Sequence, residues 1–165
     1  MTAEPLLGER VRLQPVRDGD VRRLREIRRS PGVVRWWGQP DDPSWPLGDR
    51  VTQFRGVWVG SDLVGFVQWY EEDDPRYRHA GIDLFLAEEV QGQGLGREVV
   101  AVVLAHLVSV GHHRVVIDPA ADNEAAISCY SACGFTPVGV MRRYERDADG
   151  DGWHDGLLME YVVHE

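Results

Sequence analysis

A glycine-rich turn is the segment whose residue types point most directly to chemistry. Residues 91–96 read Gln91-Gly92-Gln93-Gly94-Leu95-Gly96, between a predicted strand at residues 80–87 and a helical repeat of apolar residues. Glycines at a strand-to-helix turn let backbone N–H groups approach a ligand without interference from Cβ, and the start of a helix carries roughly half a positive charge. The turn therefore predicts a phosphate-binding site.

Three interpretations of the turn compete. A Walker loop is excluded, because no Gly-Lys-Ser/Thr sequence follows. For a dinucleotide-binding fingerprint, Gly92, Gly94 and Asp118 fit, but Arg97 stands where the third glycine belongs. The turn also follows a predicted hairpin, which is an awkward start for a doubly wound sheet. Taken alone, it is compatible with a glycine-rich loop that binds nothing.

A second motif follows the turn and favours another interpretation. Its residues are Asp118-Pro119, Asn123, Ala126-Ile127, Cys129-Tyr130 and Gly134-Phe135. Together with Gln91-x-x-Gly94-x-Gly96, this motif resembles the GNAT N-acetyltransferases, in which such a turn holds the pyrophosphate of an acyl-CoA. The resemblance implies acetyl-CoA as the acetyl donor. The donor-binding residues that it implies are Val90, Gln91, Gly92, Gly94, Gly96, Arg97 and Asn123.

Further segments narrow the resemblance to one branch of that family. Residues 34–38, 81–83, 117–119 and 129–130 are similar, in the same order, to segments of the aminoglycoside 6′-N-acetyltransferases. This implies direct transfer of the acetyl group to a 6′-amine in a ternary complex. The acidic segment at residues 71–74 and the last hairpin depart from that branch, so the acceptor stays open. The alternatives are a GNAT enzyme acting on a protein N-terminus or a polyamine-like metabolite, and an acyl-CoA-binding sensor without turnover.

The implied reaction makes three demands on the protein. The attacking amine must be unprotonated, the oxyanion must be stabilised, and the leaving thiolate takes up a proton. In the family resembled, backbone N–H groups of the strand before the turn polarise the thioester carbonyl, which points here to residues 85–87. Tyr130 would protonate the CoA sulfur, and it lies about 20° around a helix from Asn123, so both can face one cleft. The alternative for Tyr130 is packing at a helix end.

Asp83 is the candidate group for the acceptor amine. It alternates with Ile82 and Leu84, so its carboxylate faces the other side of the strand. There it would bind or deprotonate the incoming ammonium, directly or through water. The alternative is a solvated carboxylate or one paired with an arginine.

Other residues complete the candidate acceptor site. Asp118 and Asp155 are further candidate contacts to an ammonium group, and Trp36 and Trp37 could form a wall against a sugar or a cation. Loop solvation is the alternative for Asp155, and core packing is the alternative for one of the tryptophans.

Composition limits the possible functions. The 165 residues include 18 basic residues, all arginine, and 27 acidic ones, giving a net charge of −9. A lysine nucleophile is therefore excluded, and a nucleic-acid partner is disfavoured by net repulsion, whereas a small cationic amine is favoured. We expect no bound metal, no membrane segment and a cytoplasmic location. Cys129 and Cys133 are interpreted as reduced, packed thiols, with a redox pair as the alternative.

Periodicity predicts one domain over residues 1–165, as a monomer or homodimer. Strands are expected at residues 9–13, 54–59, 63–70, 80–87, 114–118, 135–144 and 157–163. Helices are expected after Asp18, over residues 95–110, and from Asp122 or Asn123 to Cys133. This order predicts an α/β (α+β) fold of the GNAT type, with a mixed, mostly antiparallel central sheet flanked by helices.

Overall fold

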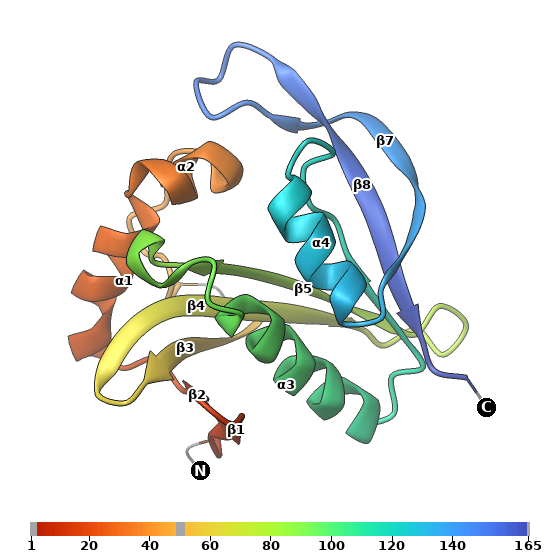
Figure 1. The fold of residues 1–165 in the computed structure, drawn as a ribbon, viewed down its shortest axis with the longest axis horizontal. Helices are drawn as coiled ribbons and strands as arrows, with labels where there is room; N and C mark the ends of the chain where they lie inside the picture. The colour runs from red at the N-terminus through yellow and green to blue at the C-terminus, as the bar shows by residue number, and fades with distance from the viewer. Residues whose placement is uncertain (1–2, 49–51, 165) are drawn as a thin grey trace.

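Eight strands form one sheet in the order β1-β2-β3-β4-β5-β6-β8-β7 in the computed structural model, which describes residues 3–48 and 52–164 (Figure 1). The strands are β1 (Leu6–Leu7), β2 (Val11–Gln14), β3 (Gln53–Val59), β4 (Asp62–Glu72), β5 (His79–Leu86), β6 (Arg114–Ile117), β7 (Thr136–Arg146) and β8 (Trp153–Val162). The helices are α1 (Val21–Arg28), α2 (Pro31–Trp37), α3 (Leu95–Ser109) and α4 (Glu124–Ala132), with short 3₁₀ turns η1 (Asp18–Asp20) and η2 (Glu88–Val90). The expected mixed, mostly antiparallel sheet is confirmed.

Both faces of the central strands are covered by helices. The apolar stripe of α3, which includes Val99 and Val103, packs on one face together with Ile82 of β5. Leu24 of α1 packs on the other face against Phe85, which is three residues further along β5. Successive side chains of a strand point to opposite faces, so one strand supplies both cores and is fixed from both sides.

The sheet opens between β5 and β6, the one parallel pair among the described strands. Only Ala80↔Val115 and Gly81↔Val116 are paired there. Beyond them β5 continues to Leu86 and β6 to Ile117 without a mutual ladder. The amides and carbonyls on this edge of β5 are therefore free of strand pairing and can face a ligand.

The last hairpin is longer than the sequence predicted. Strand β8 begins at Trp153 rather than at residue 157, because Arg146↔Trp153 and Glu145↔His154 continue the pairing with β7. The guanidinium of Arg146 also lies 5.2 Å from the centre of the Trp153 ring. This stretch is polar and mostly exposed, so its residues carry no alternation of apolar and polar side chains that would mark a strand.

Candidate active site

A cleft of about 1140 Å³ occupies the opening of the sheet. Its walls come from β5, the end of β6, α2, α4, β7 and the glycine turn that begins α3. The sequence-predicted residues that line it are Trp36, Trp37, Asp83, Gln91, Gly92, Gly94, Gly96, Arg97, Asp118, Asn123 and Tyr130. Val90 and Asp155 are not among the lining residues. Val90 ends the turn η2 and packs against both apolar cores.

The glycine turn presents backbone amides at the start of α3. Gly92 and Gly94 have φ values of 74° and 79°, which favour glycine, and Gly94 is the N-cap residue of α3. The amide of Glu98 donates to the carbonyl of Gly94, so the amides of residues 95–97 precede the first turn of helical bonding. These amides and the helix dipole give this end of the cleft a preference for anions.

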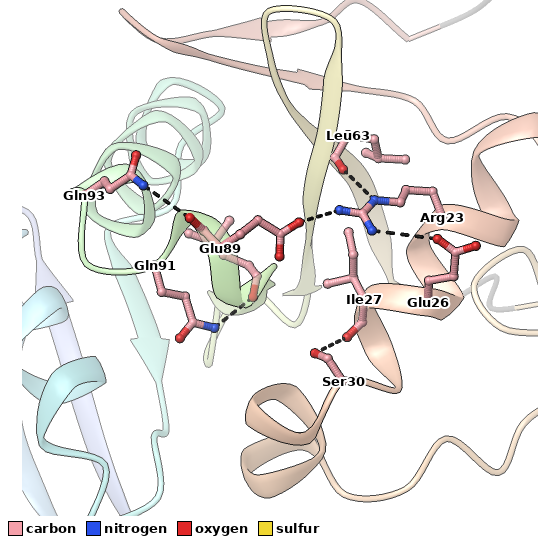
Figure 2. A network of polar contacts seen from close by, with 9 residues as sticks. Arg23, Glu26, Ile27, Ser30, Leu63, Glu89, Gln91 and Gln93 are labelled. Atoms are coloured by element: carbon pink, nitrogen blue, oxygen red, sulfur yellow. Dashed lines mark hydrogen bonds and ion pairs between the residues drawn. The ribbon is translucent and has the colours of Figure 1, made fainter.

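Side chains tie the turn to neighbouring elements. Gln91 donates to the carbonyl of Leu86 at 2.9 Å, and Gln93 donates to that of Glu89 at 3.3 Å. Figure 2 shows how Glu89 in turn pairs with Arg23 of α1, at 2.7 Å. The turn is thus held by hydrogen bonds from its own glutamines and is connected to the opposite helical layer.

Arg10 is a further cation at the turn, and sequence reasoning missed it. Its Nη1 donates to the carbonyl of Gln93 at 2.9 Å, and its Nε pairs with Glu98 of α3 at the same distance. The Glu98 carboxylate also accepts the amide of Val11 at 3.1 Å. Arg10, just before β2, is 83 residues from Gln93 in sequence, so no local motif could have indicated this contact.

The amides on the open edge of β5 differ from the expected set. The amide of Ala87 donates to the carbonyl of Val64 at 2.7 Å, so it is already used and cannot polarise a thioester. In an antiparallel ladder alternate residues direct both N–H and C=O to the same neighbour. The register therefore directs Leu84 and Leu86 to the open edge, where their carbonyls accept hydrogen bonds from Trp37 and Gln91.

Two carboxylates lie close together in the cleft. Asp83 of β5 is half-buried, and Nε2 of Gln68 on β4 lies 3.4 Å from its Oδ2. Burial raises the pKa of Asp83 to about 6, the negative charge of Asp118 adds to the rise, and the hydrogen bond from Gln68 opposes it. Burial also raises the pKa of Asp118. Two desolvated carboxylates at one site favour the arrival of a cation.

Tyr144 and Glu145 of β7 complete the acidic end of the cleft. The Tyr144 hydroxyl donates a hydrogen bond to Oδ2 of Asp118, and this bond raises the pKa of Tyr144. Burial raises the pKa of Glu145. Neither residue was expected from the sequence. Both lie in a mostly exposed strand, and only the pairing of the long β7–β8 hairpin brings that strand to the cleft.

Helix α4 contributes Asn123 and Tyr130 to the cleft. Asn123 is the N-cap, and its Oδ1 accepts the amide of Ala126 at 3.2 Å. Burial raises the pKa of Tyr130, and Cys129, Asp83 and Asp118 add to the rise, so its hydroxyl stays protonated at neutral pH. Cys129 and Cys133 are both free thiols in the structure.

The two tryptophans occupy different environments. Trp37 donates from Nε1 to the carbonyl of Leu84 at 3.1 Å and packs edge-on against Phe85, with ring centres 5.0 Å apart. Trp36 is half-buried on the cleft wall, with the guanidinium of Arg35 4.5 Å from its ring centre. Trp37 therefore lines the cleft with one part of its ring while packing against the apolar core that contains Leu24 and Phe85, and its hydrogen bond fixes the open strand. Trp36 presents its ring at the cleft wall.

Residues 3–48 and 52–164 contain neither a metal-binding cluster nor a membrane-spanning helix. No group of three or more His, Cys, Asp or Glu side chains there is placed to hold a metal ion. None of the helices in this part of the chain has the length and apolar character needed to cross a membrane.

Comparison with known proteins decides the family. The profile of the Acetyltransferase (GNAT) family matches residues 21–135. The chain belongs to the GNAT acetyltransferase family. This assignment agrees with the fold, the glycine turn at the start of α3 and the open edge of β5.

Individual GNAT relatives point to different substrates. The mycothiol acetyltransferase of Corynebacterium efficiens is 36% identical over 97 residues, or 59% of this chain and 32% of that protein. This chain therefore spans about a third of that relative's length. The aminoglycoside N(6′)-acetyltransferase type 1 of Klebsiella pneumoniae is 28% identical over 159 residues, covering 81% of this chain and 78% of that protein. A solved structure of AAC(6′)-Ib with paromomycin and acetyl-CoA shares the fold, with a TM-score of 0.73, 23% identity and coverage of 93% and 94%.

Proposed function

We propose that this GNAT protein transfers the acetyl group of acetyl-CoA to a primary amine of a small polycation, the 6′-amine of an aminoglycoside. The observation that carries the proposal is the placement of Asp83, Asp118 and Glu145 in the same cleft as the glycine turn. Carboxylates at one end attract ammonium groups, while amides and arginines at the other attract phosphates. The proposed place of action is the cytoplasm, with antibiotic resistance as a consequence.

The residues present fit acetyl-CoA. The amides of residues 95–97, together with Arg10 and Arg97, would hold its phosphates. The open edge of β5 would receive the pantetheine arm, and the amide of Leu86 would donate to the thioester oxygen. These contacts would place the acyl carbon between the glycine turn and the carboxylates of the acceptor site.

The acceptor end would bind and activate the amine. Asp83 and Asp118 would hold the ammonium, and Asp83, directly or through water, would take its proton. The free amine then attacks the thioester carbon, the C–N bond forms and the C–S bond breaks. Tyr130 would give its proton to the departing sulfur, and the proton that the attacking nitrogen loses on becoming an amide would restore the Tyr130 hydroxyl, so the products are an N-acetyl amine and CoA.

Paired substrates test the proposal. Neamine and paromamine differ in carrying an amine or a hydroxyl at position 6′, so release of CoA from acetyl-CoA with neamine alone would support both acceptor and regiochemistry. Equal turnover of both would contradict the 6′ position. Silence with both, alongside proven binding of acetyl-CoA, would contradict the aminoglycoside proposal and favour peptides with a free N-terminus, or spermidine, as the next acceptors.

A further inference from the structure

Strand β7 leaves its regular pairing at one point beside the cleft. Pairing with β8 holds at Met141↔Gly156 and resumes at Glu145↔His154, so residues 142–144 stand opposite a single residue, Asp155. Within this bulge Arg143 has a φ of 49°, the only positive φ outside glycine among the described residues. A side chain with a Cβ resists this conformation, so something must hold it there.

Asp155 supplies the hold. Its Oδ1 accepts the backbone amide of Arg143 at 2.8 Å. Its own carbonyl accepts the amide of Ala121 at 2.8 Å, and the amide of Leu157 donates to the carbonyl of Pro119 at the same distance. The segment around Asp155 thus binds the bulge on one side and the loop that follows Asp118 on the other.

The bulge directs Tyr144 into the cleft. The Tyr144 hydroxyl donates to Asp118, and its ring lies on Gly156, where an added Cβ would stand 2.7 Å from Tyr144 Cδ1. Bulges re-aim side chains in this way next to functional sites. A series of contacts therefore links Asp155 to Arg143, and through the neighbouring Tyr144 to Asp118, one carboxylate of the acceptor site.

We propose that Asp155 is a positioning residue for the acceptor site, an inference that rests on the proposed function. By holding Arg143 in the left-handed conformation it aims Tyr144 at Asp118, and so fixes the carboxylate that receives the substrate's ammonium group. Asp155 is not among the residues lining the cleft, and its carboxylate is committed to a backbone amide. This role differs from the direct ammonium contact that the sequence suggested.

Four substitutions, tested singly or in pairs, separate positioning from charge in steady-state kinetics with neamine. Asp155→Ala and Tyr144→Phe should each raise KM for neamine roughly tenfold, and the double variant should raise it no further. KM for acetyl-CoA should stay unchanged. Asp155→Asn should stay within about twofold of the parent, since its amide oxygen can still accept from Arg143. Arg143→Gly should rescue Asp155→Ala, because glycine adopts positive φ freely. An Asp155→Asn variant as impaired as Asp155→Ala would overturn the inference.

Hydrogen exchange tests the inference without any substrate. In the free protein, Asp155→Ala should speed amide exchange in residues 142–146, whereas Asp155→Asn and Asp149→Ala, a matched exposed acid in the adjoining turn, should not. Unchanged exchange in Asp155→Ala would overturn the inference. If the parent does not acetylate neamine, the proposed function fails, and the exchange result still decides whether Asp155 holds the bulge.

Discussion

The side-chain amide of Gln68 lies 3.4 Å from the carboxylate of Asp83, directly across the β4–β5 ladder that pairs the two residues. This hydrogen bond lowers the pKa of Asp83, but burial and the charge of Asp118 raise it by more, to about 6. Asp83 therefore changes charge just below neutral pH. A carboxylate tuned to this range can both hold an ammonium ion and accept a proton from it.

Replacing Gln68 should shift the pH dependence of turnover. In the parent protein, kcat/KM for the amine should rise through about pH 6 as Asp83 ionises. Gln68→Leu removes a hydrogen bond that favours the charged carboxylate, so the midpoint should move upward. A pH profile measured with saturating acetyl-CoA tests this, with Gln53→Leu on β3 as the matched control. A midpoint that stays in place would show that another group governs the profile.

Removing the Asp83 charge should stabilise the fold at neutral pH. The pKa of Asp83 rises from an ordinary 3.8 to about 6 on folding, so the folded state binds more protons between these values. Stability is then lost as pH rises through this window and stays lower above it. Asp83→Asn should raise the free energy of unfolding by about 1–3 kcal/mol at pH 7.5 and by little at pH 4. Equal changes at both pH values in urea unfolding would assign the effect to packing rather than charge.

Tyr130→Phe should separate catalysis from donor binding. The variant keeps the ring in place but removes the proton offered to the leaving sulfur, so kcat should fall roughly 100-fold or more. Affinity for acetyl-CoA, measured by calorimetry, should change by less than about threefold. Unchanged kcat would remove Tyr130 from the mechanism. Absence of turnover in the parent with aminoglycosides, peptides and spermidine alike, with donor binding intact, would instead favour the sensor alternative.

Arg10 should contribute to donor binding. It lies against the carbonyl of Gln93 and is anchored by Glu98, so Arg10→Ala removes a cation and loosens the turn. We expect donor affinity to fall roughly tenfold, with a smaller loss at high salt, because the contact with phosphate is screened. Arg12→Ala, two residues along β2, is the matched control. Equal effects of both variants would indicate a general loss of positive charge.

The glycine turn, α3, α4 and the approximate positions of most strands along the chain could be read from the sequence, since each rests on local spacing. The sequence also predicted which side chains of β5 point to which face of the sheet: Ile82 and Phe85, three residues apart, pack in the cores on opposite faces, as strand alternation requires. Local patterns also place Asn123 at the start of α4, where its side chain caps the helix. Elements whose apolar residues recur with a clear helical or strand period were therefore predictable from the sequence.

Contacts between distant segments could not be read in this way. Arg10 reaches the turn from just before β2, Tyr144 reaches Asp118 through a bulge, and the amide of Ala87 already donates to the carbonyl of Val64. Each contact depends on how distant segments pair, and a shift of the pairing by one residue would turn the side chains involved to the other face. Arg28 is another residue whose position depends on contacts outside its own helix. An arginine is usually exposed to solvent, yet this side chain is buried and donates to the carbonyls of Trp37 and Gly38.

Trp36 and Trp37, although adjacent, should respond in opposite ways to truncation. Trp37→Ala should lower the free energy of unfolding by about 3 kcal/mol, since it removes a ring packed against Phe85 and leaves the Leu84 carbonyl without its donor. Trp36→Ala should change stability by less than about 1 kcal/mol but raise KM for the amine several-fold, because a ring on the cleft wall is lost. Urea unfolding and steady-state kinetics on both variants test the contrast. A stable Trp37→Ala, or an unchanged KM in Trp36→Ala, would contradict this division between core and acceptor wall.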